Sequence, residues 1–170
     1  MASDTNRSIE EQFLQAYDAY ADAIFRHCYF RVFSRELAMD LMQESFTRTW
    51  AYLADGKTVE NLRAFIYRVA NNLIIDGSRK HKEVSLDVLQ EKGFDPATPR
   101  RKEGLQNITD GKYAIEKLRL LDPKYRTPIS MRYIDDLTPK EIAQILGESE
   151  NIVSVHIHRG MEQLRQKFEL

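Results

Sequence analysis

Residues 138–160 read TPKEIAQILGESENIVSVHIHRG, and they contain the clearest structural signal in the second half of the chain. Thr138 is suited to cap a helix that Pro139 opens, and Glu141 lies where it can reach back to complete a capping box. Gly147, which accepts a positive φ, is the residue expected where that helix ends. The pattern therefore predicts a short helix, a tight turn and a second helix from about residue 150.

Three residues within this stretch have the spacing of a helix-turn-helix. Ala143 would lie where the two helices cross, Gly147 would form the turn four residues later, and Val153 would pack back on the first helix. In such a motif the second helix enters the major groove of DNA. An ordinary helical hairpin is the alternative, because residues 148–162 carry one Arg against three Glu, whereas phosphate contacts need cations.

A further helix is predicted immediately upstream of this motif. Asp122 would cap it, and Pro123 would take its first position, where a missing N–H costs nothing. Polar side chains on the two helices of the motif are candidate contacts to bases or phosphates, although their few cations predict weak binding of DNA by this half alone. These candidates are Lys140, Ser154, His156, His158 and Arg159.

The first half of the chain has apolar residues at spacings of three and four, which predicts three antiparallel helices packed on one another. Ser8 and Glu11 would form a capping box at the start of the first helix, and Ser34 would cap the second. Residues 55–57 would end the second helix, and the third is expected over about residues 61–78. The predicted buried stripes are Phe13, Tyr17, Tyr20, Ile24 and Cys28, then Leu37, Ala38, Leu41, Met42, Ser45, Phe46 and Leu53, then Leu62, Phe65, Ile66, Val69 and Leu73.

Between the two halves the helical pattern fades. Gly93, Pro96, Pro99 and Gly104 interrupt residues 83–110, as is typical of a flexible linker. We therefore expect an all-α chain of two small helical domains, residues 8–82 and 111–170, the second of which contains the helix-turn-helix.

Charge and cysteine content narrow the class of function. The 170 residues carry a formal net charge of −1, whereas a protein that held DNA by charge alone would be clearly basic. The cations of a DNA-binding protein with this net charge must therefore be concentrated locally, or a partner must contribute to DNA binding. The single cysteine, Cys28, excludes an internal disulfide and a cysteine-based metal cluster, and we interpret it as a buried apolar residue. No stretch approaches the roughly 20 apolar residues of a membrane span, so we expect a cytoplasmic protein.

The predicted third helix concentrates positive charge. Residues 63–82 contain five Lys or Arg against one Asp, with two amides in mid-helix and aromatic neighbours one turn away. This combination suits single-stranded nucleic acid, whose bases stack and expose their edges. A solvated basic helix end, stabilised by the helix dipole, explains the same residues equally well.

The predicted second helix is acidic. Asp40, Gln43 and Glu44 lie within about one turn and would project together, as a docking face for a basic or coiled-coil partner would. Paired carboxylates also suggest an enzyme, but no His, Lys or Ser motif joins them, so catalysis is disfavoured.

These stretches together resemble the sigma-70 family of bacterial RNA polymerase subunits. DLMQESF at residues 40–46, followed by Trp50, resembles the family's polymerase-docking helix. FIYRVANNLIID at residues 65–76 resembles its promoter-melting helix, which reads the −10 element. Residues 121–126, 132–133 and the helix that contains Glu141 resemble its −35-reading domain. The order of the motifs, the size of the chain and the missing middle domain resemble the extracytoplasmic-function (ECF) branch.

The resemblance implies a transcription initiation factor that catalyses nothing and needs no cofactor. It implies that Asn72 and the loop at residues 54–61 capture a flipped base of the opened −10 strand, and that residues 83–110 thread toward the RNA exit path. Its implied partners are core RNA polymerase, promoter DNA and an anti-sigma factor. The implied polymerase contacts are Asp40, Gln43, Glu44 and Phe46, the −10 contacts are Arg68, Asn71, Asn72, Arg79 and Lys80, and the −35 contacts are the five polar candidates of the helix-turn-helix.

Two other functions fit part of the pattern. A stand-alone helix-turn-helix regulator explains only the second half, and it predicts tight binding to duplex DNA without polymerase, usually as a dimer. A protein-interaction module built on a sigma scaffold fits the acidic recognition helix, and it predicts binding to polymerase or an inhibitor without transcription.

Overall fold

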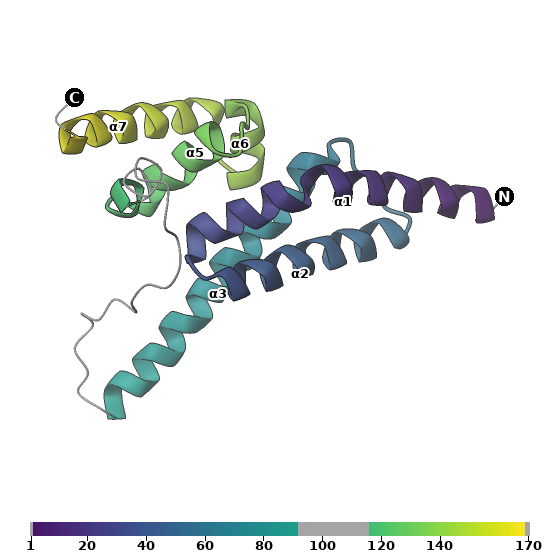
Figure 1. Cartoon of the computed structure of the whole chain (residues 1–170), viewed down its shortest axis with the longest axis horizontal. Helices are drawn as coiled ribbons and strands as arrows, with labels where there is room; N and C mark the ends of the chain where they lie inside the picture. The colour runs from purple at the N-terminus through teal and green to yellow at the C-terminus, as the bar shows by residue number, and fades with distance from the viewer. Residues whose placement is uncertain (1, 92–115, 169–170) are drawn as a thin grey trace, which may run out of the picture.

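The computed structural model describes residues 2–91 and 116–168, and within these ranges every regular element is a helix (Figure 1). The N-terminal bundle contains α1 (Ala2–Val32), α2 (Arg35–Ala54) and α3 (Leu62–Glu91). The C-terminal half contains α5 (Pro123–Tyr133), α6 (Pro139–Leu146) and α7 (Glu150–Phe168). The all-α prediction is therefore confirmed.

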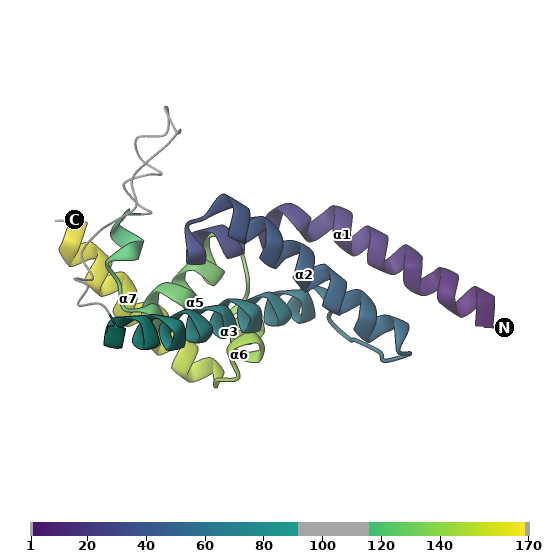
Figure 2. The same ribbon diagram turned by 90° about the horizontal axis from the view of Figure 1, so that it is seen from below.

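The N-terminal bundle packs α1 against α2, and α3 against both (Figures 1 and 2). Ser34 caps α2 as predicted, since its side-chain oxygen accepts a hydrogen bond from the Leu37 backbone N–H at 3.3 Å. The helix ends at Ala54 with Asp55 as its C-cap, and Gly56 follows with a φ of 78°. The break expected at residues 55–57 is thus present.

Two predicted helix ends were wrong. The first helix begins at Ala2 and runs through Ser8, which accepts a hydrogen bond from the Gln12 amide inside the helix. The third helix continues to Glu91, beyond the predicted end at residue 78. In both places the chain lacks Gly or Pro to stop a helix, because residues 2–7 have neither and the first breaker after Gly77 is Gly93. Residues 83–91 of the predicted linker are therefore helical, and residues 92–110 lie outside the described residues.

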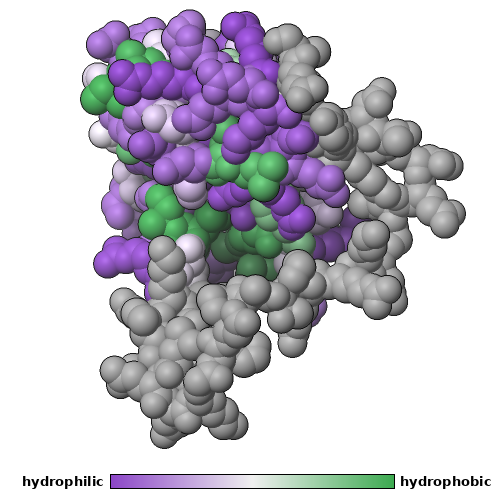
Figure 3. Space-filling view, turned by 90° about the vertical axis from the view of Figure 1, so that its left-hand side faces the viewer, coloured by the Kyte–Doolittle hydropathy of each residue, from purple (hydrophilic) through white to green (hydrophobic). Residues whose placement is uncertain are grey.

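Most residues of the predicted stripes face the bundle, although two positions are exposed and six are only half-buried, namely Phe13, Tyr20, Leu41, Leu62, Phe65 and Val69. Tyr17 is exposed, although its ring meets that of Phe46 edge-on at a centroid distance of 4.8 Å. Leu37 is also exposed, because it lies in the first turn of α2, where it lines a surface cleft and not the bundle interior. This cleft of about 840 Å³ lies between α1, α2, α3 and α5. The face shown in Figure 3 carries a hollow in which apolar residues gather between hydrophilic ones.

The C-terminal half is the predicted helix-turn-helix preceded by α5. The Asp122 side chain caps α5 by accepting from the Lys124 N–H at 3.0 Å. Both hydrogen bonds of the Thr138–Glu141 capping box are present, at 2.9 and 3.2 Å. Gly147 ends α6 with a φ of 68°, and Val153 is fully buried. The helical-hairpin alternative to this motif is disfavoured, since Gly147 has the left-handed conformation and Ala143 and Val153 are buried as expected.

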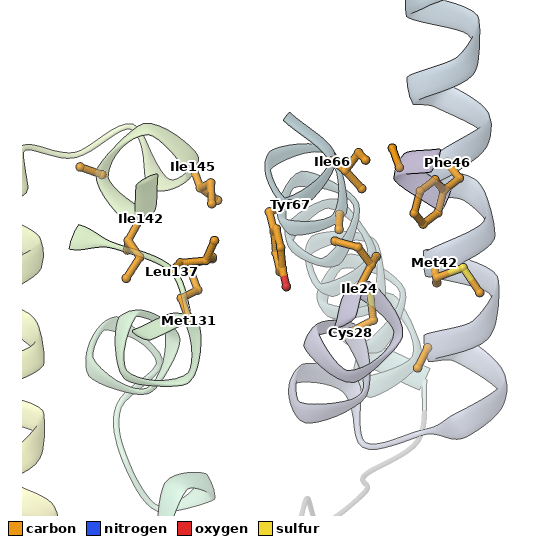
Figure 4. Close-up of a cluster of buried hydrophobic side chains, with 14 of the residues drawn as sticks. Ile24, Cys28, Met42, Phe46, Ile66, Tyr67, Met131, Leu137, Ile142 and Ile145 are labelled. Atoms are coloured by element: carbon orange, nitrogen blue, oxygen red, sulfur yellow. The ribbon is translucent and has the colours of Figure 1, made fainter. Parts of the chain in front are cut away.

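The two halves share one hydrophobic core, which the sequence did not predict. Met131, Leu137 and Ile142 of the C-terminal half are fully buried in the same cluster as Tyr67 and Ile24 of the bundle. Figure 4 shows the side chains of the C-terminal half facing Tyr67 on α3. The two predicted domains, whose relative arrangement the sequence left open, are therefore packed on each other in this conformation.

Candidate nucleic-acid and partner interfaces

The first turns of α3 present a cationic and aromatic surface. The Arg68 guanidinium lies over the Phe65 ring at 5.4 Å, and the Tyr52 ring lies 4.8 Å from Phe65 between centroids. The Lys57 ammonium in turn lies 4.9 Å from the Tyr52 ring. Such a surface offers bases both stacking partners and positive charge. Lys57 belongs to the loop at residues 54–61 that the family resemblance already implied, whereas sequence reasoning missed Tyr52, which joins the cluster only through tertiary packing.

The predicted −10 residues divide between the surface and the interior. Arg68, Asn72, Arg79 and Lys80 are exposed on α3. Asn71 is only 3% exposed, and its side-chain oxygen accepts a hydrogen bond from the Arg31 guanidinium at 3.3 Å. The DNA contact expected of Asn71 stays a prediction, and in this conformation Asn71 instead ties α3 to α1.

A cleft of about 550 Å³ lies between the start of α3 and α6. Arg68 and Asn61 line its bundle side, while Lys140 and Gln144 line the side of the C-terminal half. The structure thus brings a predicted −10 residue and a predicted −35 residue to one cleft. No pattern in the sequence could have shown this, because the two residues are 72 positions apart and belong to different predicted domains.

Of the four predicted polymerase contacts on α2, the three polar residues are exposed and Phe46 is buried. Asp40, Gln43 and Glu44 are exposed on α2, and the Glu44 carboxylate pairs with Arg48 at 2.7 Å on the same helix. Phe46 is only 3% exposed and packs edge-on against Phe13 at a centroid distance of 6.1 Å. It therefore supports α2 from inside, and the polymerase contact expected of Phe46 stays a prediction.

The predicted −35 residues on α7 are not equally available. Ser154, His158 and Arg159 are exposed, as is Lys140 on α6. The His156 ring is partly buried, 3.5 Å from the Glu148 carboxylate and edge-on to the Tyr125 ring at 5.8 Å. A close helix crossing orients α7, since a Cβ at Gly160 would overlap the Ile129 side chain of α5. His156 therefore lies on the side of α7 that packs against α5.

A buried polar contact joins the two halves. His27 Nδ1 of α1 lies 2.8 Å from Asp135 Oδ2 in the α5–α6 connection, and these side chains are 0% and 2% exposed. Burial lowers the pKa of His27, and the nearby Arg31 guanidinium lowers it further, so the ring is neutral and donates its Nδ1–H to the carboxylate. Burial also lowers the pKa of Arg31, to about 10, which leaves it charged. At the interface between the two halves, the Asp135 carboxylate thus faces the neutral His27 ring and lies near the buried Arg31 cation.

Arg63 extends this contact onto α3. Its guanidinium donates to the backbone carbonyls of Asp135 and Asp136, at 2.9 and 3.3 Å, and lies 3.6 Å from the Glu141 carboxylate. Burial by itself raises the pKa of Glu141, but hydrogen bonds from Thr138 and the charge of Arg63 outweigh it and lower that pKa. The capping-box glutamate of the helix-turn-helix is therefore also an anchor between the two halves.

Nothing in the described residues indicates a metal site or a membrane span. Across residues 2–91 and 116–168, no three His, Cys, Asp or Glu side chains gather as ligands, and none of the helices is long and apolar enough to cross a bilayer. Cys28 is buried as predicted, and burial raises the pKa of its thiol to about 12. A protonated, buried thiol of this kind is inert.

Comparison with known proteins matches both halves of the chain. The Sigma-70 region 2 family model matches residues 16–84, and the Sigma-70 region 4 model matches residues 112–164. The ECF RNA polymerase sigma factor SigW of Bacillus subtilis (strain 168) is 30% identical, and the alignment covers 93% of this chain and 89% of SigW. The RNA polymerase sigma factor SigV of the same strain is 26% identical, with 83% of this chain and 81% of SigV covered.

Two solved structures have a similar fold. One is the sigma factor RpoE in complex with the anti-sigma factor NepR from Bartonella quintana, with a TM-score of 0.77 and 17% identity, covering 94% of this chain and 98% of that one. The other is CnrH in complex with the cytosolic domain of CnrY, with a TM-score of 0.71 and 19% identity, covering 99% of this chain and 94% of that one.

The three-helix bundle, the helix-turn-helix and these matches define the class of protein: the chain belongs to the sigma-70 family, whose members direct RNA polymerase to promoters. Within that family it is a sigma factor of the extracytoplasmic-function branch, as SigW is.

Proposed function

We propose that this sigma factor divides promoter reading between two surfaces. The exposed face of α3, with Arg68 and Asn72, reads the −10 element as a single strand, and α6 and α7 read the −35 element as a duplex. The observation that carries this proposal is the cationic and aromatic cluster of Tyr52, Phe65 and Arg68. Bases that have left the duplex stack on such rings, whereas paired bases cannot.

Core RNA polymerase docks on the acidic face of α2 in this proposal. Asp40, Gln43 and Glu44 project from consecutive turns into solvent, so a basic or coiled-coil surface can meet all three without unfolding the bundle. The polymerase supplies the chemistry of RNA synthesis, and the sigma factor itself catalyses no reaction. The functional parts in this proposal are residues 8–82 and 111–170, and within the connecting residues 83–110 the first part, to Glu91, continues α3.

An anti-sigma factor is the second proposed partner. Both solved structures of similar fold are complexes of a sigma factor with an anti-sigma protein or its cytosolic domain. Their likeness extends over nearly the whole chain, so the packing of the two halves here is compatible with the arrangement in those complexes. We infer that an inhibitor binds this packed conformation of the sigma factor.

Run-off transcription tests the proposed function. Purified core polymerase is supplied with a library of promoter fragments, with and without the full chain. New transcripts that require the chain are expected, and Asn72→Ala is expected to lose them while it still binds polymerase. Gln15→Ala, which truncates an exposed amide on α1, is the matched control and should keep them.

Two outcomes contradict the proposal. Firm polymerase binding without any transcript favours an interaction module, the alternative that the glutamates of residues 148–162 support. No polymerase binding together with tight binding to duplex DNA favours a stand-alone regulator.

A further inference from the structure

The recognition helix presents two apolar side chains that take no part in the core. Ile152 is 45% exposed and Val155 is 37% exposed, whereas Val153 between them is fully buried. At 3.6 residues per turn, Val155 lies nearly opposite Val153, and Ile152 lies one turn earlier. Asn151 and Arg159 are exposed on the same side of α7. These four residues, Asn151, Ile152, Val155 and Arg159, form a stripe on the outer face of the helix.

Other polar groups near this stripe each have one partner within the protein, although Ser154 and His158 remain exposed. The Ser154 hydroxyl donates to the Glu150 carbonyl at 2.9 Å, and the His156 ring faces Glu148 and Tyr125. The His158 ring lies 3.4 Å from the Glu162 carboxylate. The chemistry that the outer face offers is therefore mainly an amide, two branched apolar side chains and one guanidinium.

This set of side chains fits base edges better than phosphates. Residues 148–162 carry one Arg against three Glu, so the start of α7 attracts the phosphate backbone weakly. In the major groove, an Asn amide pairs with adenine N6 and N7, and apolar side chains contact the C5-methyl group of thymine. The first residues of a recognition helix are the ones that reach base edges. Ile152 and Val155 occupy these positions.

We propose that Ile152 and Val155 are specificity-determining residues, which read thymine methyl groups in the −35 duplex beside an adenine read by Asn151. This inference rests on the proposed function, since it requires α7 to lie in the major groove of that element. The −35 preference of this sigma factor is then set by methyl contacts more than by charge.

Replacing thymine by uracil tests the proposal, because uracil lacks only the methyl group. Holoenzyme is reconstituted from core polymerase and the full chain, and its affinity is measured for the −35 element of a promoter selected by run-off transcription. Each thymine in that element is replaced in turn. About a fourfold loss of affinity is expected for each contacted methyl, the value for withdrawing one buried methylene-sized group.

A double variant assigns the effect to the two residues. Ile152→Ala with Val155→Ala should bind the thymine and uracil elements equally. Leu14→Ala, which shortens another exposed apolar side chain on α1, should keep the full discrimination. The ratio of the two affinities should not change between about 50 and about 200 mM salt, because methyl contacts release no counterions.

The outcomes separate this inference from the proposed function. Transcription that depends on the chain but is indifferent to uracil at every −35 thymine would overturn the inference and leave the sigma function intact. Discrimination that persists in the double variant would also overturn it, since other residues would then read the methyl groups. No transcription with any promoter would instead contradict the proposed function.

Discussion

The outer face of α3 and the outer face of α7 differ in character, although both belong to DNA-reading regions of one protein. The α3 face combines Arg68 and Lys57 with aromatic rings, whereas the α7 face presents Ile152 and Val155 among glutamates. Cations with aromatic rings suit an unpaired strand, and apolar groups suit the methyl edges of a duplex. On the proposed function, charge therefore contributes more to DNA binding at α3 than at α7, where apolar contacts set the preference for the −35 sequence.

A second difference lies in how the halves are held. Each half has its own capped helices, but the deepest apolar residues of the C-terminal half pack on the bundle. In the α5–α6 connection, the Asp135 side chain also contacts His27, and the Asp135 backbone carbonyl accepts a hydrogen bond from Arg63. The two sigma-factor regions therefore depend on each other for stability in the packed conformation.

The largest expected effect on stability comes from truncating a side chain in the core that the two halves share. Leu137→Ala removes a fully buried side chain between the halves, and it should lower the free energy of unfolding by about 2–5 kcal/mol. Chemical denaturation followed by circular dichroism measures this loss. Leu120→Ala, at an exposed position, is the control and should change little. A loss below 1 kcal/mol for Leu137→Ala would show that the halves do not share a core in solution.

Removing the buried carboxylate should have the next largest effect. Asp135→Ala leaves the His27 Nδ1–H without its acceptor, which should cost about 1–3 kcal/mol in the same denaturation experiment. Asp18→Ala removes an exposed carboxylate from α1 and should cost almost nothing. Equal stabilities of the two variants would contradict the assigned role of Asp135.

The pH dependence of the unfolding free energy tests the same contact, between His27 and Asp135. Burial lowers the pKa of His27 below its ordinary value of 6.5, so the folded protein holds the ring neutral while the unfolded chain takes up a proton. This stabilisation is complete above pH 6.5 and is lost progressively as the pH falls below that value. Unfolding free energies measured across this range should therefore decrease toward acid.

His27→Gln should remove that part of the pH dependence. His158→Gln alters an exposed ring on α7 and should retain it. A wild-type stability that rises toward acid would mean that the protonated ring pairs with Asp135, contrary to the direction expected here.

The smallest expected effect separates the two DNA-reading faces. Arg68→Ala should reduce the salt dependence of promoter binding by the holoenzyme, lowering the slope of log affinity against log salt by about one. Val155→Ala should leave that slope unchanged, because an apolar contact releases no counterion. Filter binding over a salt series measures both slopes, and equal reductions in the two variants would contradict the division between charge and discrimination.

Local signals predicted most of the fold. Ser34, Asp122 and the Thr138–Glu141 capping box mark helix starts through hydrogen bonds within three residues, so the sequence contains all the partners. The ends at Ala2 and Glu91 were missed because nothing in the sequence stops a helix at Ser8 or Ser78. A helix without a breaker continues as far as its neighbours allow.

Contacts across the two halves were beyond sequence reasoning. His27 lies in an apolar stripe, and its partner Asp135 is 108 positions away, so neither residue signals the other. The same limit applies to Asn71, for which the family resemblance implied a DNA contact while packing placed it inside, whereas the burial of Phe46 was predicted from its helical spacing. Helical periodicity predicted which of the candidate residues lie on the outer faces of α2, α3 and α7, whereas their roles came from the family resemblance and stay predictions.

The most direct test of the division between the two faces is to observe the −10 base itself. A fluorescent adenine analogue in the non-template strand, which brightens when it leaves the base stack, is placed in the −10 element of a selected promoter. The account predicts that fluorescence rises only when core polymerase and this chain are both present, and that Asn72→Ala abolishes the rise while the Ile152 and Val155 variants keep it once −35 binding is saturated. A rise without the chain, or one that Asn72→Ala leaves intact, would contradict the assignment of single-strand reading to α3.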